Sequence, residues 1–422
     1  AVKKRIMLLF YRIIILLVFF LSPLILIFRL INKKETLKSF FEKVGRSNNK
    51  RTRKGKILWF HGSSVGEILG IIPLIEKLEA KKNIKQILIT SNTLSSYKII
   101  SKLPLKKVVH QFFPIDTNFL NKKFINFWKP DLAIFVESEI WPNMILEIKK
   151  QKIPLVLLNA RFTKKSFLRW KLIESFSRLI VSKFDICLTQ NDETIDYLKK
   201  LGAKNIKKAG NLKFCEPRLT KKENEKTINN SFLNSKKILF CAVSTHYDEE
   251  IFCGKIHKDS KNINKNATTI IIPRHINRSS EIKNDLEKMG LKVQLHSLSK
   301  NLKNDTDIYL VDAYGETLKF LKLSKIAFLG GSLVDYKGHN PMEAARLGIK
   351  VLHGKYTSNH EEAYDLLKKI KVSKKINNTR DALIFIKTVK ITKEKTQKTK
   401  KQLNNIGKII LSSNFKETCK YI

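Results

Sequence analysis

Paired cysteines are missing from this sequence of 422 residues. The five cysteines are scattered, none belongs to a CxxC pair, and their number is odd. Disulfide frameworks and zinc sites usually need cysteines at short, regular spacing. No cluster of His, Asp and Glu residues with metal-ligand spacing stands out either. We therefore expect a protein of a reducing compartment that uses no metal cofactor.

Acidic residues are scarce beside basic ones, with 37 Asp and Glu against 82 Lys and Arg and a net charge of +45. Of the basic residues, 68 are lysines, which recognise phosphate less specifically than arginine does. A genome-wide bias in composition accounts for such an excess, and so does attraction to anionic lipid or nucleic acid. Aromatic residues interleaved with basic ones, which single-stranded nucleic acids require, are absent. We expect no nucleic-acid partner.

The N-terminal part contains the longest apolar run of the chain, over residues 6–31. Its length suffices to cross a bilayer, which takes about 20 residues. No small-residue cleavage site follows it, so we expect an uncleaved membrane anchor over residues 1–35. Basic residues flank the run on both sides and leave its orientation open. Arg12 and Pro23 also permit a helix that lies in the membrane interface, where anionic lipids would attract the basic surface.

Beyond the anchor, short apolar runs alternate with amphipathic stretches, which is typical of βαβ units. No period of 20–50 residues repeats, which argues against a solenoid. We expect two doubly wound parallel-sheet α/β domains that face each other across a cleft, over residues 36–214 and 236–422, joined by a polar linker at 215–235. The expected strands are 56–60, 84–90, 110–114, 132–136, 155–158 and 185–189 in the first half, and 237–243, 268–272, 307–311, 325–330 and 350–353 in the second.

Polar residues follow nearly every expected strand of the first half, and ligands of open parallel sheets bind outside the carboxyl ends of the strands. Glu67 opens an expected helix, where it would also complement the helix dipole. Glu137 and Glu139 are one residue apart and would share one face of a strand. Burying both as carboxylates requires a cation, and Lys213, after a Gly-Asn turn, is a candidate. Glu139 would orient a neighbour or close the turn with Trp141.

The second half places a different chemistry at its strand ends. Arg274 ends an expected strand and suits a phosphate or the edge of a base. Residues 340–343 read Asn-Pro-Met-Glu, which predicts a helix start with Asn340 at the N-cap, Pro341 at N1 and Glu343 at N3. The N-terminus of such a helix would also stabilise a phosphate without a metal.

Eight short motifs follow one another along the chain. In chain order they are HGSSVGE, ESEIWPN, LLNARFTKKS, GNLKF, STHYDEE, IPRH, YGE and GGSLVDYKGHNPMEAA. Taken together, these motifs resemble one family, the Kdo transferases of lipopolysaccharide synthesis. Each motif is weak by itself, but their order along the chain makes the resemblance specific. It extends from the N-terminal anchor to about residue 370.

The resemblance implies a GT-B fold at the cytoplasmic side of the inner membrane. It implies transfer of 3-deoxy-D-manno-octulosonic acid (Kdo) from CMP-Kdo to a lipid A precursor, with inversion and without a metal. The acceptor would bind the N-terminal domain, with Glu67 as the general base and Glu137 and Lys213 supporting the transition state. The donor-binding residues that the resemblance implies are Pro273, Arg274, Tyr314, Gly315, Glu316, Asn340, Pro341, Met342 and Glu343.

Two other classes of protein are compatible with parts of the sequence. Another nucleotide-sugar enzyme of the same fold, an epimerase or a transferase, would need neither the membrane anchor nor the ESE pair. A non-catalytic protein that binds anionic surfaces would account for the charge. That protein would carry aromatic residues among its basic ones, whereas the Lys-rich stretch 387–401 is typical of a solvated helix face.

Overall fold

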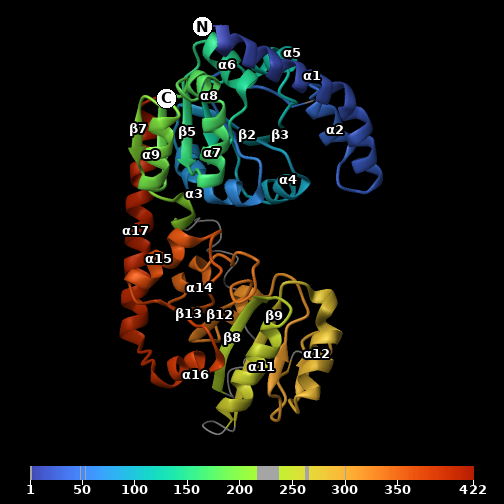
Figure 1. The fold of residues 1–422 in the computed structure, drawn as a ribbon, viewed down its shortest axis with the longest axis vertical. Helices are drawn as coiled ribbons and strands as arrows, with labels where there is room; N and C mark the ends of the chain where they lie inside the picture. The colour runs from blue at the N-terminus through green and yellow to red at the C-terminus, as the bar shows by residue number, and fades with distance from the viewer. Residues whose placement is uncertain (1, 48, 53, 216–236, 262–265, 300) are drawn as a thin grey trace. The chain divides into compact units, whose positions relative to one another are not determined.

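The computed structural model describes residues 2–47, 49–52, 54–215, 237–261, 266–299 and 301–422 (Figure 1). The chain forms two compact units, one of residues Ala1–Thr220 and Ile406–Ile422 and one of Lys221–Asn405. Nearly all of the expected linker at 215–235 lies outside the described residues.

The first unit is built on a seven-stranded sheet of order β3-β2-β1-β4-β5-β6-β7, in which all neighbouring strands are parallel. Its central strands are apolar along their whole length because both faces of the sheet are covered. The strands are β1 (Lys56–His61), β2 (Ile84–Ser91), β3 (Val108–Phe112), β4 (Leu132–Val136), β5 (Leu155–Ala160), β6 (Ile186–Thr189) and β7 (Ile206–Lys208).

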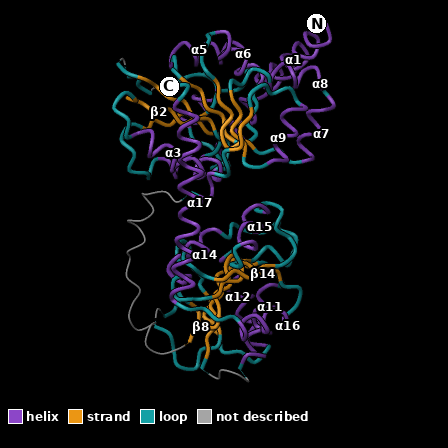
Figure 2. Tube along the Cα trace, turned by 90° about the vertical axis from the view of Figure 1, so that its left-hand side faces the viewer, coloured by secondary structure: helices purple, strands orange, loops and turns teal. Residues whose placement is uncertain are grey.

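Helices cover both faces of this sheet (Figure 2). Helices α5, α6, α8 and α9 pack on one face around Trp59 and Phe135. Helices α3 and α4 pack on the other face. The helices of the unit are α1 (Val2–Ile31), α2 (Leu37–Lys43), α3 (Val65–Glu79), α4 (Leu94–Ile100), α5 (Asn118–Trp128), α6 (Pro142–Lys150), α7 (Lys164–Leu172), α8 (Glu174–Val181), α9 (Asp192–Lys200) and the short 3-10 helix η1 (Leu212–Phe214).

The second unit repeats the architecture, with a parallel sheet of order β10-β11-β9-β8-β12-β13-β14. Helices α13, α14 and α15 cover one face and α11, α12 and α16 the other. The strands are β8 (Lys237–Thr245), β9 (Ala267–Pro273), β10 (Val293–Leu295), β11 (Ile308–Leu310), β12 (Ile326–Leu329), β13 (Lys350–His353) and β14 (Ser373–Lys375). The helices are α11 (Glu249–Ser260), η3 (Ile276–Arg278), α12 (Ser279–Lys288), α13 (Thr317–Leu321), α14 (Met342–Arg346), α15 (Glu361–Lys369), α16 (Thr379–Thr388) and α17 (Lys393–Cys419).

The two doubly wound parallel sheets confirm the fold class expected from the sequence. Every expected strand is present. Three strands, β7, β10 and β14, were not expected. Each has three residues and lies at an edge of its sheet, where one side is left without a partner strand and no long apolar run is needed.

The C-terminal limit expected for the second domain, residue 422, differs from the structure, because residues 406–422 belong to the first unit. Ile410, Leu411 and Phe415 of α17 pack against the same sheet face as α3. The buried side chain of Asn414 donates a hydrogen bond to the carbonyl oxygen of Ala209 at 3.1 Å. The polar, Lys-rich composition of α17 conceals this apolar stripe.

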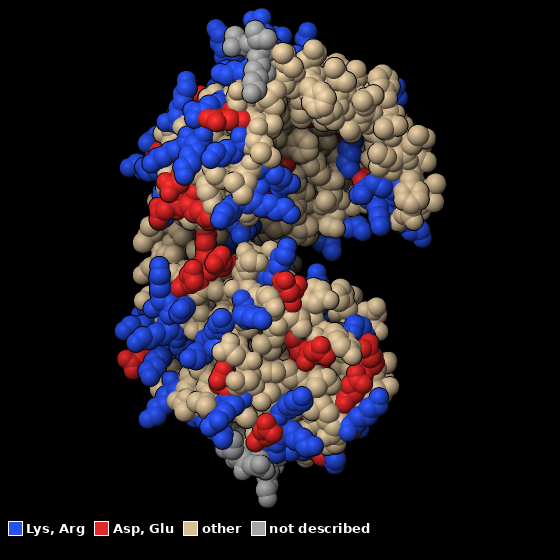
Figure 3. Space-filling model, viewed as in Figure 1, with Lys and Arg blue, Asp and Glu red and all other residues tan. Residues whose placement is uncertain are grey.

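Helix α1 lies along the first unit on its α5, α6 and α8 side (Figure 1). Residues at helical spacing face the domain, from Leu8 to Leu26. The Tyr11 hydroxyl donates to the Asp116 carboxylate at 2.7 Å, and Phe19 meets Phe119 edge to face at 5.1 Å. The opposite side of α1 is apolar and exposed, and it forms a surface free of acidic and basic side chains in Figure 3. This helix is long and apolar enough to cross a membrane.

Candidate active site

In the first unit, the strand order reverses between β1 and β4. After β1 the chain continues to β2 on one side of the sheet, and after β4 it continues to β5 on the other side. Such a reversal opens a crevice at the carboxyl ends of the two strands, where parallel sheets bind ligands. Glu67 follows β1, and Glu137 and Glu139 follow β4. Topology therefore brings the three predicted carboxylates to one place in the fold.

Glu67 lies in the first turn of α3, after the N-cap residue Ser64. Its carboxylate accepts hydrogen bonds from the backbone N–H of Ser63 at 2.7 Å and from the Ser64 hydroxyl at 2.9 Å. The Ser64 hydroxyl oxygen in turn accepts from the backbone N–H of Glu67. The capping role and a catalytic role are compatible, because capping fixes the carboxylate at a defined position.

The electrostatic surroundings of Glu67 suit a base. Burial, followed by the negative charge of Glu139, raises the pKa of Glu67 to about 7. Hydrogen bonds from Ser64 and Ser63 and the charge of Glu137 act with smaller effects. A carboxylate with a pKa near the working pH is present in its basic form and still accepts a proton readily.

Glu139 is held in a network of polar groups. One of its oxygens, Oε2, lies 3.1 Å from His61 Nε2, 2.5 Å from the Ser63 hydroxyl and 2.8 Å from the Trp141 indole nitrogen. The expected contact with Trp141 is present. Ser63 joins the two acids, since its N–H donates to Glu67 and its hydroxyl to Glu139.

The spacing of Glu137 and Glu139 predicted that they share one face of a strand. This prediction is wrong, because β4 ends at Val136. The backbone of Glu137 is left-handed, with φ of 57°, and this turn sends the two side chains in different directions. Glu137 forms an ion pair with Lys213, with Oε1 2.5 Å from Nζ. The predicted pairing of a strand-end acid with this lysine is therefore present in the structure.

Two residues position Lys213 on η1. The buried side chain of Asn159, at the end of β5, accepts a hydrogen bond from the backbone N–H of Leu212 at 2.9 Å. On α3, a Cβ at Gly70 would lie 3.1 Å from Lys213 Cγ, so the absence of a side chain there lets the lysine cross the helix. The role of Gly70 was not expected from the sequence.

In the second unit, the strand order reverses between β8 and β12. The loops that follow these strands touch closely. A Cβ at Gly330, after β12, would lie only 2.3 Å from the carbonyl oxygen of Ser244 in β8. Glycine is therefore required where the two loops meet. The second unit thus has its own crevice at the same topological position as the first.

Glu249, the first residue of α11, ties these loops together. Its buried carboxylate accepts four backbone hydrogen bonds of 2.7–3.1 Å. The role of Glu249 was not expected from the sequence, although acidic residues shortly after Ser-Thr-His are a recognisable signal of a helix start. The four donors are the N–H groups of His246, Gly331, Ser332 and Leu333.

The predicted donor-binding residues lie at three neighbouring places on this edge of the sheet. Pro273 ends β9, and the exposed Arg274 follows it, with its N–H bonded to the carbonyl oxygen of Thr245. Tyr314, Gly315 and Glu316 lie between β11 and α13. The strands β9 and β11 are adjacent in the sheet.

The third place is the start of α14, which differs from the expectation. The helix begins at Met342, so Pro341 and not Asn340 occupies the N-cap position. The Asn340 side chain still accepts a hydrogen bond from the backbone N–H of Met342 at 3.0 Å. Glu343 lies in the first turn of the helix, which has only five residues.

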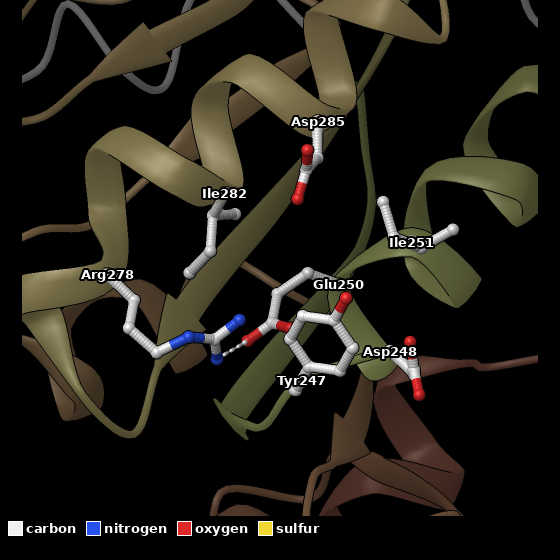
Figure 4. Close-up of a pocket in the computed structure, with 7 residues that line it drawn as sticks. All are labelled: Tyr247, Asp248, Glu250, Ile251, Arg278, Ile282 and Asp285. Carbon is white, nitrogen blue, oxygen red and sulfur yellow. Dashed lines mark hydrogen bonds and ion pairs between the residues drawn. The ribbon is translucent and has the colours of Figure 1, made fainter.

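A small cavity lies beside this edge, between α11 and α12 (Figure 4). Arg278 lies 5.3 Å from the centre of the Tyr247 ring and 3.5 Å from the Glu250 carboxylate. Burial raises the pKa of Glu250 to about 7, although Arg278 opposes this shift. The volume, about 30 Å³, admits little more than a water molecule. This cavity is too small for a nucleotide.

Residues 38–216 match the family model of the 3-deoxy-D-manno-octulosonic-acid transferases. The chain is 34% identical over 340 residues to the 3-deoxy-D-manno-octulosonic acid transferase of Rickettsia bellii, covering 80% of each protein. It is 28% identical over 364 residues to the transferase of the same name from Haemophilus influenzae, covering 85% of the chain and 83% of the relative.

Solved structures agree on the fold. The UDP-GlcNAc 2-epimerase of Neisseria meningitidis bound to UDP-GlcNAc superimposes with a TM-score of 0.56 at 15% identity, covering 85% of this chain and 99% of the epimerase. The superposition establishes a shared GT-B fold, and at this low identity it establishes no more. The fold alone does not distinguish one family from another, whereas the sequence relatives do. They show that the chain belongs to the Kdo transferase family of glycosyltransferases in lipopolysaccharide synthesis.

Proposed function

We propose that this protein transfers Kdo from CMP-Kdo to the lipid A precursor, with inversion at the anomeric carbon and with Glu67 as the general base. The observation that carries the proposal is the position of Glu67 at the switch point of the first sheet, with a pKa raised to about 7. A hydroxyl of the acceptor has to lose its proton as its oxygen attacks the sugar carbon. A carboxylate fixed by Ser63 and Ser64 is suited to take that proton.

The Glu137–Lys213 pair would stabilise the charge that develops during transfer. The Kdo donor carries a carboxylate, so a lysine fixed near it lowers the electrostatic cost of the transition state. Glu137 keeps Lys213 at a defined position through their ion pair. A lysine held in place before the reaction needs no reorganisation at the moment of transfer.

The edge of the second sheet would bind CMP-Kdo. Arg274 is exposed at the end of β9 and offers a planar, permanently charged group to a phosphate or to the cytosine ring. The loops at Tyr314–Glu316 and Asn340–Glu343 follow other strands of the same sheet and end at the same edge. We expect them to contact the ribose and the sugar.

We further propose that α1 lies in the interface of the inner membrane, with the catalytic units on the cytoplasmic side. Its polar contacts to Asp116 and Asn143 hold it on the domain, and its exposed side is apolar. A helix that packs on its domain with one side and exposes an apolar surface on the other suits a position along a membrane surface, with lysines nearby for anionic lipids. The lipid acceptor would then be within reach of the first unit.

Incubation of the purified protein with CMP-Kdo and a tetra-acylated lipid A precursor tests the proposal, with the products resolved by mass. We expect the acceptor to gain Kdo, and we expect the same yield in EDTA. Loss of transfer in EDTA that magnesium restores would refute the metal-free mechanism. If CMP-Kdo is not consumed and UDP-GlcNAc is epimerised instead, the transferase assignment itself is wrong.

A further inference from the structure

Three histidines that the proposed function does not use gather at the carboxyl ends of the strands of the second sheet. His246 follows β8, His275 follows β9, and His339 lies in the loop after β12. The Nε2 atoms of His246 and His339 are 3.2 Å apart, and the ring planes differ by 5°. At this distance one nitrogen donates and the other accepts, so two neutral rings share a single proton between these atoms.

The surrounding loop fixes both rings. His246 is 6% exposed and stacks on Tyr336 with ring centres 3.9 Å apart. Gly331 has a φ of +65°, and a Cβ there would lie 3.3 Å from His339 Nε2 and 3.4 Å from His246 Cδ2. The carbonyl oxygen of His339 accepts a hydrogen bond from the Tyr364 hydroxyl at 2.9 Å. The pair is therefore a built feature of the strand ends.

The charges that act most strongly on the pair are positive. Burial, followed by His339, His275, Arg274 and Arg278, lowers the pKa of His246 to about 4. Burial and Arg274 also lower the pKa of His339. An additional proton, which would turn one of the two rings into an imidazolium, is thus disfavoured in the free protein. An anion bound among these bases would favour that protonation.

The carboxylates of α11 face other groups. Glu249 uses both oxygens on the four backbone N–H groups described above. Glu250 pairs with Arg278 at 3.5 Å. From the loop after β12, Tyr336 contributes an aromatic ring, and the exposed side chains of Asp335 and Lys337 carry opposite charges in that loop. Among the residues that the structure describes, no acidic side chain pairs with either ring, and a bound anion could supply the counter-charge.

We propose that His246 and His339, with Arg274, bind the phosphate of the nucleotide donor, and that binding adds one proton to the pair. The inference rests on the proposed use of CMP-Kdo. The proton comes from solvent and forms a new N–H bond on an imidazole ring, while every bond of the phosphate stays intact. The imidazolium then faces the phosphodiester charge at close range, which stabilises the complex.

The methyl phosphodiester of CMP is a suitable probe, because a phosphate monoester titrates near pH 6 by itself and a diester does not. We expect it to bind the full-length protein roughly tenfold more tightly at pH 6 than at pH 8, which corresponds to uptake of about half a proton on average over this range. Calorimetry in two buffers of different ionisation enthalpy should show uptake of about half a proton near pH 7 and of nearly one proton at about pH 6.

Substitutions identify the groups that take up the proton. His246→Gln and His339→Gln keep a polar nitrogen near Nε2 but cannot become cations, so each should remove most of the pH dependence. Glu250→Gln is the matched control, because a carboxyl with a pKa of about 7 could also take up a proton near a bound anion. We expect that variant to keep the tenfold difference.

The outcomes separate this inference from the proposed function. Binding of the diester with equal affinity at pH 6 and pH 8 would overturn the histidine subsite and leave the donor assignment standing. Loss of the pH dependence in Glu250→Gln, with retention in both histidine variants, would also overturn it. If neither the diester nor CMP binds at millimolar concentration, the CMP-Kdo assignment fails, and the subsite with it. The wild-type measurement decides even if a variant does not fold.

Discussion

Glu67 combines two requirements that oppose each other. A base needs a raised pKa, and here burial and the neighbouring Glu139 raise it. The same burial makes the charged form costly to the fold. Ser63 and Ser64 offset part of that cost through hydrogen bonds to the carboxylate. Activity and stability should therefore respond in opposite directions to one substitution at this position.

For activity, we predict that Glu67→Gln lowers turnover by roughly 10²–10⁴, because the amide keeps the size of the side chain but accepts no proton. Wild-type turnover should rise with pH to a plateau above about pH 7, where Glu67 is ionised. Affinity for CMP should barely change, since the proposed donor residues lie in the other unit. Initial rates between pH 5 and 9 check this. Near-normal turnover in the variant would refute the base assignment.

For stability, the pKa of Glu67 in the folded protein, about 7, lies above its ordinary value of 4.5. The stabilisation of the folded state by the protonated Glu67 side chain is complete below pH 4.5 and is lost as the pH rises through 7. Glu67→Gln cannot ionise, so its free energy of unfolding relative to wild type should increase by about 2 kcal/mol between pH 5 and pH 8.

Urea titration followed by tryptophan fluorescence measures this difference for the first unit alone, because all four tryptophans (Trp59, Trp128, Trp141 and Trp170) lie in it. A stability difference that does not change between the two pH values would contradict the raised pKa. Gln at the neighbouring exposed position, Ser64→Gln, is not a suitable control because Ser64 caps α3.

The ion pair of Glu137 and Lys213 predicts coupling. Glu137→Gln and Lys213→Met should each lower turnover by roughly 10². The double variant should be little worse than either single one, because both changes disable the same positioned charge. A double-mutant cycle of turnover under saturating substrate measures the coupling. Full additivity would show that the two residues act separately.

At the scale of elements, α1 has two different sides. The side that packs on the domain contributes Tyr11 and Phe19, and the other side exposes Phe20, Leu24 and Phe28 at 68–69%. The first side should serve the fold and the second the membrane. Deletion of the whole helix would remove both the packing on the domain and the membrane contact. Substitutions on the exposed side change the membrane contact alone.

We predict that the triple change of Phe20, Leu24 and Phe28 to Lys strongly reduces binding to vesicles of zwitterionic lipid and leaves the fold intact. Each change removes a large apolar side chain from the proposed interface and adds a charge. Sedimentation with vesicles in high salt measures the apolar part of binding, since salt screens the basic surface. Leu298→Lys, at a 77% exposed leucine of the second unit, is the control and should bind like wild type. Unchanged binding of the triple variant would argue against α1 as the membrane contact.

At the scale of the whole molecule, the chain returns to its first unit. Residues 393–405 of α17 belong to the second unit and residues 406–422 to the first. The Cys215 thiol donates to the carbonyl oxygen of Gly407 at 3.2 Å, where a Cβ would lie 2.9 Å from the carbonyl oxygen of Phe214. Glycine thus permits the close approach of α17 to the end of η1, next to Lys213.

We predict that removal of residues 406–422 lowers the unfolding free energy of the first unit by about 3 kcal/mol or more, from the lost burial of Ile410, Leu411 and Phe415. The tryptophan signal reports on this unit, so urea unfolding followed by fluorescence gives the change. The single variants Ile410→Ala and Phe415→Ala should each produce a smaller shift in the same direction. A truncated protein as stable as wild type would mean that the segment merely covers the surface.

The alternation of apolar strands with helices was sufficient to predict two doubly wound sheets, because a strand buried on both faces must be continuously apolar. Family motifs selected Glu67, Glu137 and Lys213, whose roles in transfer stay a prediction, although the structure does pair Glu137 with Lys213. The edge strands β7, β10 and β14 escaped prediction, since strands of three residues with polar neighbours leave no periodic signal. Glu249 and Gly70 escaped it because their partners are distant in sequence.

What the sequence alone determined, then, is local: which segments are strands, which carry polar ends, and which family the motifs resemble. Tertiary structure decided how these pieces meet. The left-handed turn at Glu137 separated two acids that spacing alone placed together. The return of α17 moved 17 residues from one unit to the other, and the meeting of His246 with His339 joined residues 93 positions apart. Such contacts depend on the topology of the sheet, which brings distant strand ends to one edge, and no local pattern encodes them.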